Sequence, residues 1–102
     1  MNHITPIELK EKLNSNQLLQ LIDVREPFEH EAYNIGGTLI PFSEILEKQD
    51  LINTEIPVVF YCKVGIRSQI AIQRLKEKFG FTNLINLRGG MERWKKDIDK
   101  KL

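Results

Sequence analysis

Helix and strand signals alternate along almost the whole chain, and this alternation restricts the possible folds more than any other feature of the sequence. Residues 18–24 and 58–61 are nearly uninterrupted apolar runs, which is typical of parallel strands covered on both faces. Residues 39–40 and 83–87 are two further strand candidates. We therefore predict an α/β fold, with an open and mostly parallel sheet of about five short strands and helices on both faces.

The segments between the strands contain helix signals. Thr5-Pro6-Ile7-Glu8 has the form of a capping box with proline at the first helical position, which predicts a helix over residues 6–13. Shorter helices are predicted after Glu26-Pro27 and after Ser43, which can serve as an N-cap. A longer helix is predicted to begin near Arg67 and to end at Gly80. Its apolar stripe consists of Ala71, Leu75 and Phe79.

Length, charge and cysteine content restrict the class of protein. The 102 residues predict a single domain, 1–102, that can hold a core without a disulfide or a metal. With one cysteine and only His3 and His30, we expect no metal, no cofactor and two surface histidines. The net charge of +1 gives no case for nucleic acid, and no apolar run has membrane-spanning length. We expect the protein to reside in the reducing cytoplasm.

The single cysteine, Cys62, lies where an apolar strand stops and a helix is about to begin. Amide groups in a tight loop that opens a helix have no intrahelical acceptor, so they favour a nucleophilic thiolate at this place. No proline interrupts the loop, and Gly65 can adopt the positive φ that tight curvature needs. Cys62 is thus the candidate catalytic residue. The candidate substrate-binding residues are those that follow it: Lys63, Val64, Gly65, Ile66, Arg67 and Ser68.

Charged residues surround this loop in the predicted fold. Lys63 and Arg67 add positive charge that can attract an anionic donor, although Lys63 is equally well explained as an exposed side chain without a contact. Asp23 and Arg88 lie at the carboxyl ends of other strands, where open α/β sheets bind ligands. We expect Asp23 and Arg25 to brace the loop rather than to touch substrate, and we place Arg88 with them as a supporting residue.

Three motifs, taken together and in this order, resemble the rhodanese-like domain family of single-domain sulfurtransferases, and the resemblance covers essentially the whole chain. They are Asp23-Val24-Arg25-Glu26-Pro27, the run from Cys62 to Ser68, and Asn86-Leu87-Arg88-Gly89-Gly90 followed by Trp94. The family implies an α/β fold around a parallel sheet and a cysteine that holds sulfur as a persulfide. One segment departs, because Asn34-Ile35-Gly36-Gly37-Thr38 stands where the family usually reads His-Ile-Pro-Gly-Ala. Without that proline we expect a less rigid segment.

The resemblance implies a sulfurtransferase that moves sulfane sulfur from a small donor such as thiosulfate to cyanide or a thiol. Because the chain has no second cysteine to resolve the persulfide, we expect an external thiol or a protein as acceptor. A cysteine phosphatase or arsenate reductase is one alternative, but such loops have five residues between cysteine and arginine, against four here. A non-catalytic interaction module is the other alternative, and it has no chemical need of Cys62.

Overall fold

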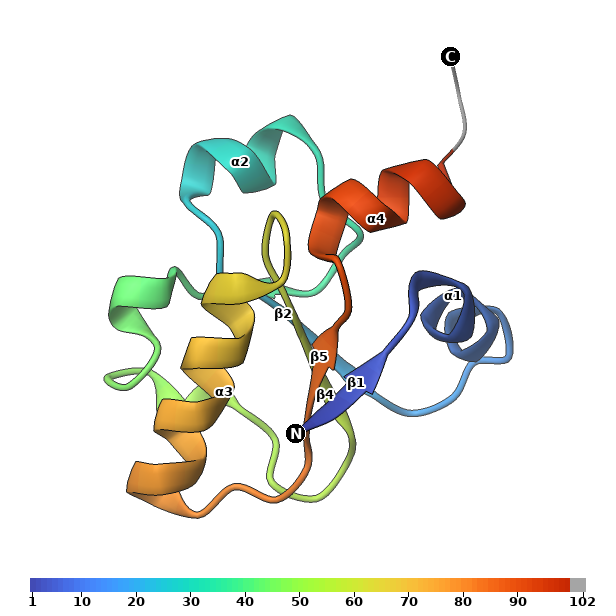
Figure 1. Cartoon of the computed structure of the whole chain (residues 1–102). Helices are drawn as coiled ribbons and strands as arrows, with labels where there is room; N and C mark the ends of the chain where they lie inside the picture. Colours follow the sequence, from blue (N-terminus) through green and yellow to red (C-terminus); the bar gives the residue numbers. More distant parts are fainter. Residues whose placement is uncertain (100–102) are drawn as a thin grey trace.

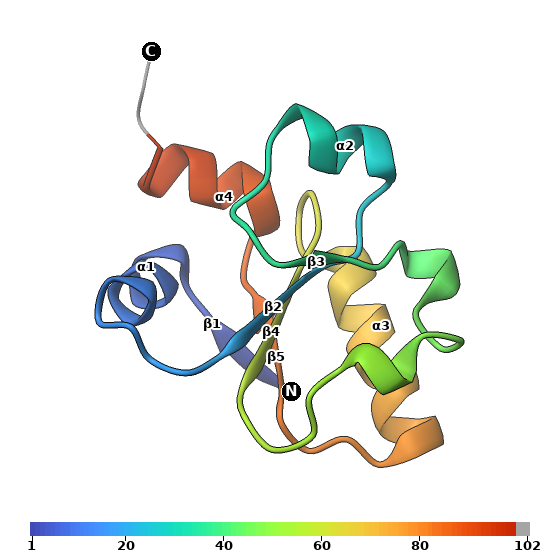
Figure 2. The same cartoon turned by 180° about the vertical axis from the view of Figure 1, so that it is seen from behind.

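The computed structural model describes residues 1–99 and contains one five-stranded sheet in which all paired strands are parallel (Figures 1 and 2). The strand order is β1-β5-β4-β2-β3, so β4 lies at the centre. The strands are β1 (Asn2–Ile4), β2 (Gln20–Asp23), β3 (Thr38–Leu39), β4 (Val58–Tyr61) and β5 (Leu84–Leu87). The predicted α/β class with a parallel sheet is confirmed.

Four helices surround the sheet. They are α1 (Pro6–Asn14), α2 (Pro27–Ala32), α3 (Ile66–Phe79) and α4 (Gly90–Asp97), and the 3-10 turns η1 (Phe42–Glu44) and η2 (Gln49–Leu51) follow β3. In Figure 1, α3 covers one face of the sheet, whereas α1 and α4 lie on the other. Both overall views show α2 and α4 next to the carboxyl ends of the strands. No helix within residues 1–99 combines the length and apolarity needed to cross a membrane.

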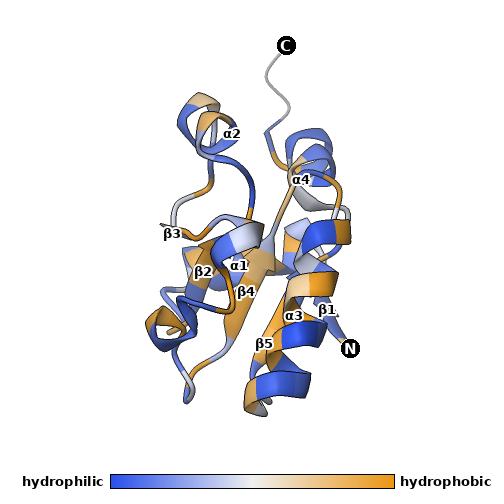
Figure 3. Cartoon of the chain, turned by 90° about the vertical axis from the view of Figure 1, so that its left-hand side faces the viewer, coloured by the Kyte–Doolittle hydropathy of each residue, from blue (hydrophilic) through white to orange (hydrophobic). Residues whose placement is uncertain are grey.

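Alternate residues of the central strand build the two halves of the core. Val58 and Phe60 pack into the layer beneath α3, and Val59 and Tyr61 pack into the layer beneath α1 and α4. Side chains of successive strand residues point to opposite faces, so a continuous apolar strand supplies both layers. Figure 3 shows this strand as a hydrophobic stretch flanked by helices in which hydrophilic and hydrophobic residues alternate. All four β4 residues are buried, which fixes the position of the cysteine that follows them.

Local capping chemistry explains where the first helix begins. The Thr5 hydroxyl accepts a hydrogen bond from the Glu8 amide at 3.2 Å, and the Glu8 carboxylate accepts one from the Thr5 amide at 2.9 Å. This reciprocal pair satisfies two amide groups that have no intrahelical acceptor, and Pro6 occupies the first helical position. The predicted capping box is confirmed.

Strand boundaries differ most from the sequence-based expectation in the first two strands, whereas β3 and β5 differ from it by one residue. The sequence pattern does not predict the first strand, β1, because three residues at a chain end give no periodicity. The second begins at Gln20 rather than at Leu18, whose side chain is 75% exposed. The amide of Gln20 donates to the carbonyl of Pro57, and β4 begins one residue later, so residues before Gln20 have no strand partner.

Two helix predictions also need correction. Ser43 does not cap a helix: it lies inside η1, whose N-terminal flanking residue is Pro41. Phe79 is not part of the buried stripe of α3, because the last turn of the helix extends past the sheet. The ring of Phe79 contacts Phe81 edge-on instead, at 6.4 Å between centroids, while Ile72 is buried in the stripe.

Candidate active site

Cys62 follows β4 directly, and its side chain is fully buried beneath the loop that leads into α3. The amide of Gly65 donates to Cys62 Sγ at 3.1 Å, and the amide of Ser68 donates to the same sulfur at 3.4 Å. Gly65 adopts a φ of 94°, a left-handed conformation that allows the chain to turn back over the sulfur. The loop therefore presents N–H groups to a sulfur anion.

The first turn of α3 has further amide groups available. The helix begins at Ile66, so the amides of Ile66 and Arg67 have no intrahelical acceptor. They lie in sequence between the two amides that already donate to Cys62 Sγ. A helix N-terminus with free donors stabilises negative charge, so this turn has further donors for an anionic group next to Cys62 Sγ.

Helix α4 holds the backbone of the loop from the other side. The amide of Met91 donates to the carbonyl of Cys62 at 2.9 Å, and the amide of Glu92 donates to the carbonyl of Lys63 at 3.0 Å. A Cβ atom at Gly90 would overlap the carbonyls of both loop residues, which explains the glycine there. Because these carbonyls are bound to α4, the loop has its amides left to face the sulfur.

A second set of polar contacts leads away from the sulfur beneath α3. Ser68 Oγ lies 3.4 Å from Cys62 Sγ and donates to Asn86 Oδ1 in β5. Asn86 Nδ2 in turn lies 3.2 Å from His3 Nδ1 in β1. The expectation that both histidines are simple surface residues is therefore wrong for His3. The sequence pattern identifies neither His3 nor Asn86 as a site residue, because only the strand register brings them together.

Partial burial, with the positive charges of Arg88 and the N-terminal amine, lowers the pKa of His3. Arg88 is exposed at the end of β5, and its amide donates to the Ile4 carbonyl at 2.9 Å. The structure thus places Arg88, predicted as a supporting residue, on the β1 side of the sheet.

The two positive residues of the loop have different surroundings. Arg67 forms two hydrogen bonds with the Glu29 carboxylate of α2, at 3.1 and 3.3 Å. These bonds lower the pKa of Glu29 and raise the pKa of Arg67. Lys63 is exposed and forms no ion pair with any residue in the described part of the chain. Within residues 1–99, Arg67 therefore has a carboxylate partner and Lys63 has none.

Asp23 and Arg25 form a buried ion pair, with Arg25 Nη2 2.8 Å from Asp23 Oδ2. His30 Nδ1 lies 2.8 Å from the same carboxylate oxygen, and Arg25 also donates to the Tyr33 carbonyl at 2.6 Å. His30 too is thus more than a surface residue. Among the described residues these hydrogen bonds go to α2 and the residue after it, and none goes to residues 63–68. Their link to the loop is indirect, through Glu29 of the same helix.

The segment that lacks the usual proline is attached by other contacts. The Tyr61 hydroxyl donates to the Gly36 carbonyl at 2.9 Å, and Asn34 Oδ1 accepts from the Gly36 amide at 2.8 Å. Gly37 lies so close to β2 that a Cβ atom would come within 2.5 Å of the Leu21 carbonyl oxygen. Glycine is therefore required there for space as well as for its φ of 88°.

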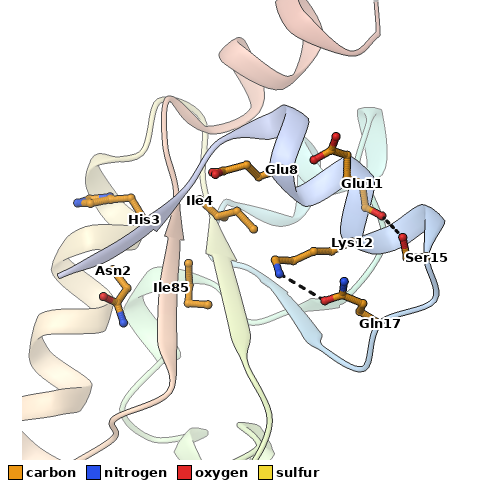
Figure 4. A pocket seen from close by; sticks show the side chains of 9 residues that line it. All are labelled: Asn2, His3, Ile4, Glu8, Glu11, Lys12, Ser15, Gln17 and Ile85. Atoms are coloured by element: carbon orange, nitrogen blue, oxygen red, sulfur yellow. Dashed lines mark hydrogen bonds between the residues drawn. The ribbon is translucent and has the colours of Figure 1, made fainter.

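Two hollows bear on where a substrate can approach. A pocket of about 320 Å³ lies between α2 and α4 beside the loop, and Phe28, Tyr33, Lys63 and Met91 are among the residues that line it. A larger hollow of about 500 Å³ lies between β1 and α1 and is shown in Figure 4. None of the loop residues lines that second hollow, so the first is the one next to the cysteine.

The fold and the site define a parallel α/β domain with a cysteine-centred amide loop at the carboxyl end of its central strand. The rhodanese-like domain family model matches residues 5–97. The chain belongs to the rhodanese-like domain family, as its three motifs predicted.

Two curated relatives and one solved structure illustrate the relationship. The probable adenylyltransferase/sulfurtransferase MoeZ of Mycobacterium tuberculosis is 41% identical over 98 residues, which cover 93% of this chain and 25% of the relative. The putative sulfur carrier protein YrkF of Bacillus subtilis is 34% identical over 86 residues, 83% of this chain and 46% of the relative. This chain therefore spans from a quarter to about half of these relatives. A rhodanese-like domain protein from Staphylococcus aureus has a TM-score of 0.83 at 32% identity, covering 92% of this chain and 91% of that one.

Proposed function

We propose that this protein is a sulfurtransferase that holds sulfane sulfur as a persulfide on Cys62. The observation that supports this most directly is the pair of loop amides, from Gly65 and Ser68, that donate to Cys62 Sγ. Amide donors fixed around a buried sulfur favour its anionic form, which is the nucleophile. The relative named as a sulfurtransferase, MoeZ, supports the same chemistry.

The reaction is a double displacement. With thiosulfate as donor, the Cys62 thiolate attacks the outer sulfur, a sulfur–sulfur bond forms, and sulfite leaves with the electron pair of the broken bond. An acceptor thiolate or cyanide then attacks the outer sulfur of the persulfide, and Cys62 leaves as a thiolate. No net oxidation of the protein occurs over the cycle. The amides of Ile66 and Arg67 are suited to the persulfide anion, because the helix supplies them with no other acceptor.

The short loop favours sulfur over a phosphoryl group. Four residues separate Cys62 from Arg67, one fewer than in cysteine phosphatases. Arg67 is also bound to Glu29, so its guanidinium already has a carboxylate partner where a phosphatase would use it for the phosphate. A phosphate ester therefore has less room and less uncompensated positive charge at this site.

The surface around the loop favours a protein or a thiol acceptor over a purely inorganic one. Phe28, Ile66 and Val64 are 73%, 61% and 41% exposed, and all three lie around the cysteine loop and the pocket beside it. An exposed apolar surface next to a reactive group is typical of a docking site. The relative named as a putative sulfur carrier protein supports such a partner. A free catalytic thiol also suits the reducing cytoplasm.

Intact-protein mass spectrometry after treatment with thiosulfate tests the proposal. We expect the mass to increase by one sulfur atom, and cyanide or dithiothreitol should remove it. Cys62→Ser should abolish the increase, and its circular dichroism spectrum should match that of the unmodified protein. An unchanged mass under non-reducing conditions, with Cys62 still alkylated by iodoacetamide, would instead favour a non-catalytic binding module.

A further inference from the structure

A buried hydrogen-bonded series runs from Cys62 to the edge of the sheet, and nothing in the transfer reaction requires it. It passes from Cys62 Sγ to Ser68 Oγ, from Ser68 to Asn86 Oδ1, and from Asn86 Nδ2 to His3 Nδ1. His3 and Asn86 are direct partners in the β1–β5 register, and Asn86 also pairs with Phe60 of β4. Figure 4 shows His3 leaving β1 on the side away from α1.

The single hydroxyl proton of Ser68 gives this series a direction. An amide oxygen can only accept, so the Ser68 hydroxyl must donate its proton to Asn86 Oδ1. Ser68 Oγ then has only lone pairs for Cys62 Sγ at 3.4 Å. This arrangement suits a neutral thiol, whose S–H can donate to Ser68, and it withholds a hydroxyl donor from a thiolate.

A half-turn of the Asn86 amide reverses every donor in the series. Amide oxygen and nitrogen are nearly equal in size, so the turn fits the same space. Asn86 Nδ2 would then donate to Ser68 Oγ, and the Ser68 hydroxyl would be released to donate to the Cys62 thiolate. Asn86 is 1% exposed, so its oxygen cannot find bulk water. That oxygen would face His3 Nδ1, which must then hold a proton.

We propose that Asn86 and His3 are positioning residues that couple the proton on His3 Nδ1 to the charge on Cys62. A neutral Cys62 thiol requires His3 Nδ1 to be unprotonated. A Cys62 thiolate requires His3 Nδ1 to hold a proton, either in the neutral tautomer or in the imidazolium. His3 is half-buried, so its ring can exchange protons with solvent. The coupling rests on the proposed role of Cys62 as a nucleophile, but it does not need sulfur transfer to occur.

Other charged groups act on His3 at one end of the series and on Cys62 at the other, so a test of the coupling must leave these groups unchanged. Arg88 and the N-terminal amine act on His3, and Glu8 of α1 lies near Arg88 and lines the hollow of Figure 4 with His3. On the sulfur side, Arg67 and Lys63 belong to the loop itself. None of these groups is part of the series, so removing its middle leaves them in place.

Nuclear magnetic resonance of protein with 15N-labelled histidine tests the coupling. The pH dependence of iodoacetamide alkylation first locates the ionisation of Cys62. Over that same pH range, we expect the Nδ1 signal of His3 to shift toward the protonated form. His30 is the matched control in the same chain, because its Nδ1 contacts Asp23 and not this series. Cys62→Ser should remove the shift of His3 and leave its ordinary titration.

Ser68→Ala interrupts the series while keeping the Ser68 backbone amide that donates to the sulfur. We expect it to abolish the shift of His3 and to slow alkylation below the ionisation midpoint by about tenfold, because a donor to a charged group is lost. A His3 signal that titrates identically in the unmodified protein, Cys62→Ser and Ser68→Ala would overturn the coupling. Failure of the persulfide to form, with the His3 shift present, would count against the proposed function alone.

Discussion

Two cations of the cysteine loop differ in what their charges are available to do. The Arg67 guanidinium is held by Glu29, whereas the Lys63 ammonium is exposed beside the pocket and has no carboxylate partner within residues 1–99. An unpaired surface charge attracts anions from solution, and its effect decreases with salt. At the scale of single residues, Lys63 is therefore the better candidate for recruiting an anionic donor, and Arg67 for holding α2 beside the loop.

Replacing Lys63 by alanine tests this assignment. We expect KM for thiosulfate to rise about threefold to tenfold at low salt with kcat little changed, because a uniform binding interaction is lost. The difference should shrink at high salt. Lys76→Ala is the matched control, since Lys76 lies in the last turn of α3, far along the helix from the loop. Equal KM values for the Lys63 variant and the unmodified protein in steady-state kinetics would show that Lys63 does not contribute to thiosulfate binding.

Contacts within one element could be predicted from the sequence, whereas contacts between elements could not. The capping box of α1 and the cysteine loop depend on residues three to six positions apart, so local spacing reveals them. The Arg67–Glu29 pair spans 38 positions and the Asn86–His3 contact spans 83. Both depend on strand order and helix placement, which no local pattern specifies. A donor–acceptor residue on a buried strand, such as Asn86, is the one available signal for the second contact.

The Glu29–Arg67 contact connects α2 to α3, and its contribution to stability should depend on pH. Arg67 lowers the pKa of Glu29 below its ordinary value of 4.5. The ionised carboxylate is therefore favoured in the folded state, so the stabilisation is complete above pH 4.5 and is lost as the pH falls through the lowered pKa. Because both side chains are partly exposed, we expect about 0.5 kcal/mol.

Urea unfolding of Glu29→Gln at pH 7 and at pH 3 measures this term. The variant should be less stable than the unmodified protein at pH 7, and the difference should become smaller at pH 3. Glu44→Gln is the control, because Glu44 pairs with Lys48 four residues away within one exposed segment. A difference that is the same at both pH values would show that the carboxylate charge does not stabilise the α2–α3 contact.

At the scale of the whole molecule, the two ends of the sheet differ. The cysteine loop, α2 and the start of α4 gather at the carboxyl ends of the strands, and the pocket beside Lys63 lies among them (Figures 1 and 2). The exposed apolar side chains of Phe28, Val64 and Ile66 belong to this end. Leu18 is about as exposed as Phe28, but it precedes β2 at the amino end of the sheet. Phe28 and Leu18 are exposed apolar residues at opposite ends of the sheet. Comparing them therefore separates an effect of docking from an effect of exposure alone.

Phe28→Ser and Leu18→Ser should both leave the folded state intact, because 73% and 75% of these side chains already face solvent. If the apolar end receives a protein acceptor, Phe28→Ser should slow sulfur transfer to reduced thioredoxin, used as a protein thiol, by about fivefold or more. Transfer to cyanide, which needs no docking surface, should not change. Leu18→Ser should transfer sulfur to both acceptors at the unmodified rate. Single-turnover loss of the persulfide measures these transfer rates. Equal slowing with cyanide and thioredoxin would show that Phe28 affects the chemistry of the loop and not docking.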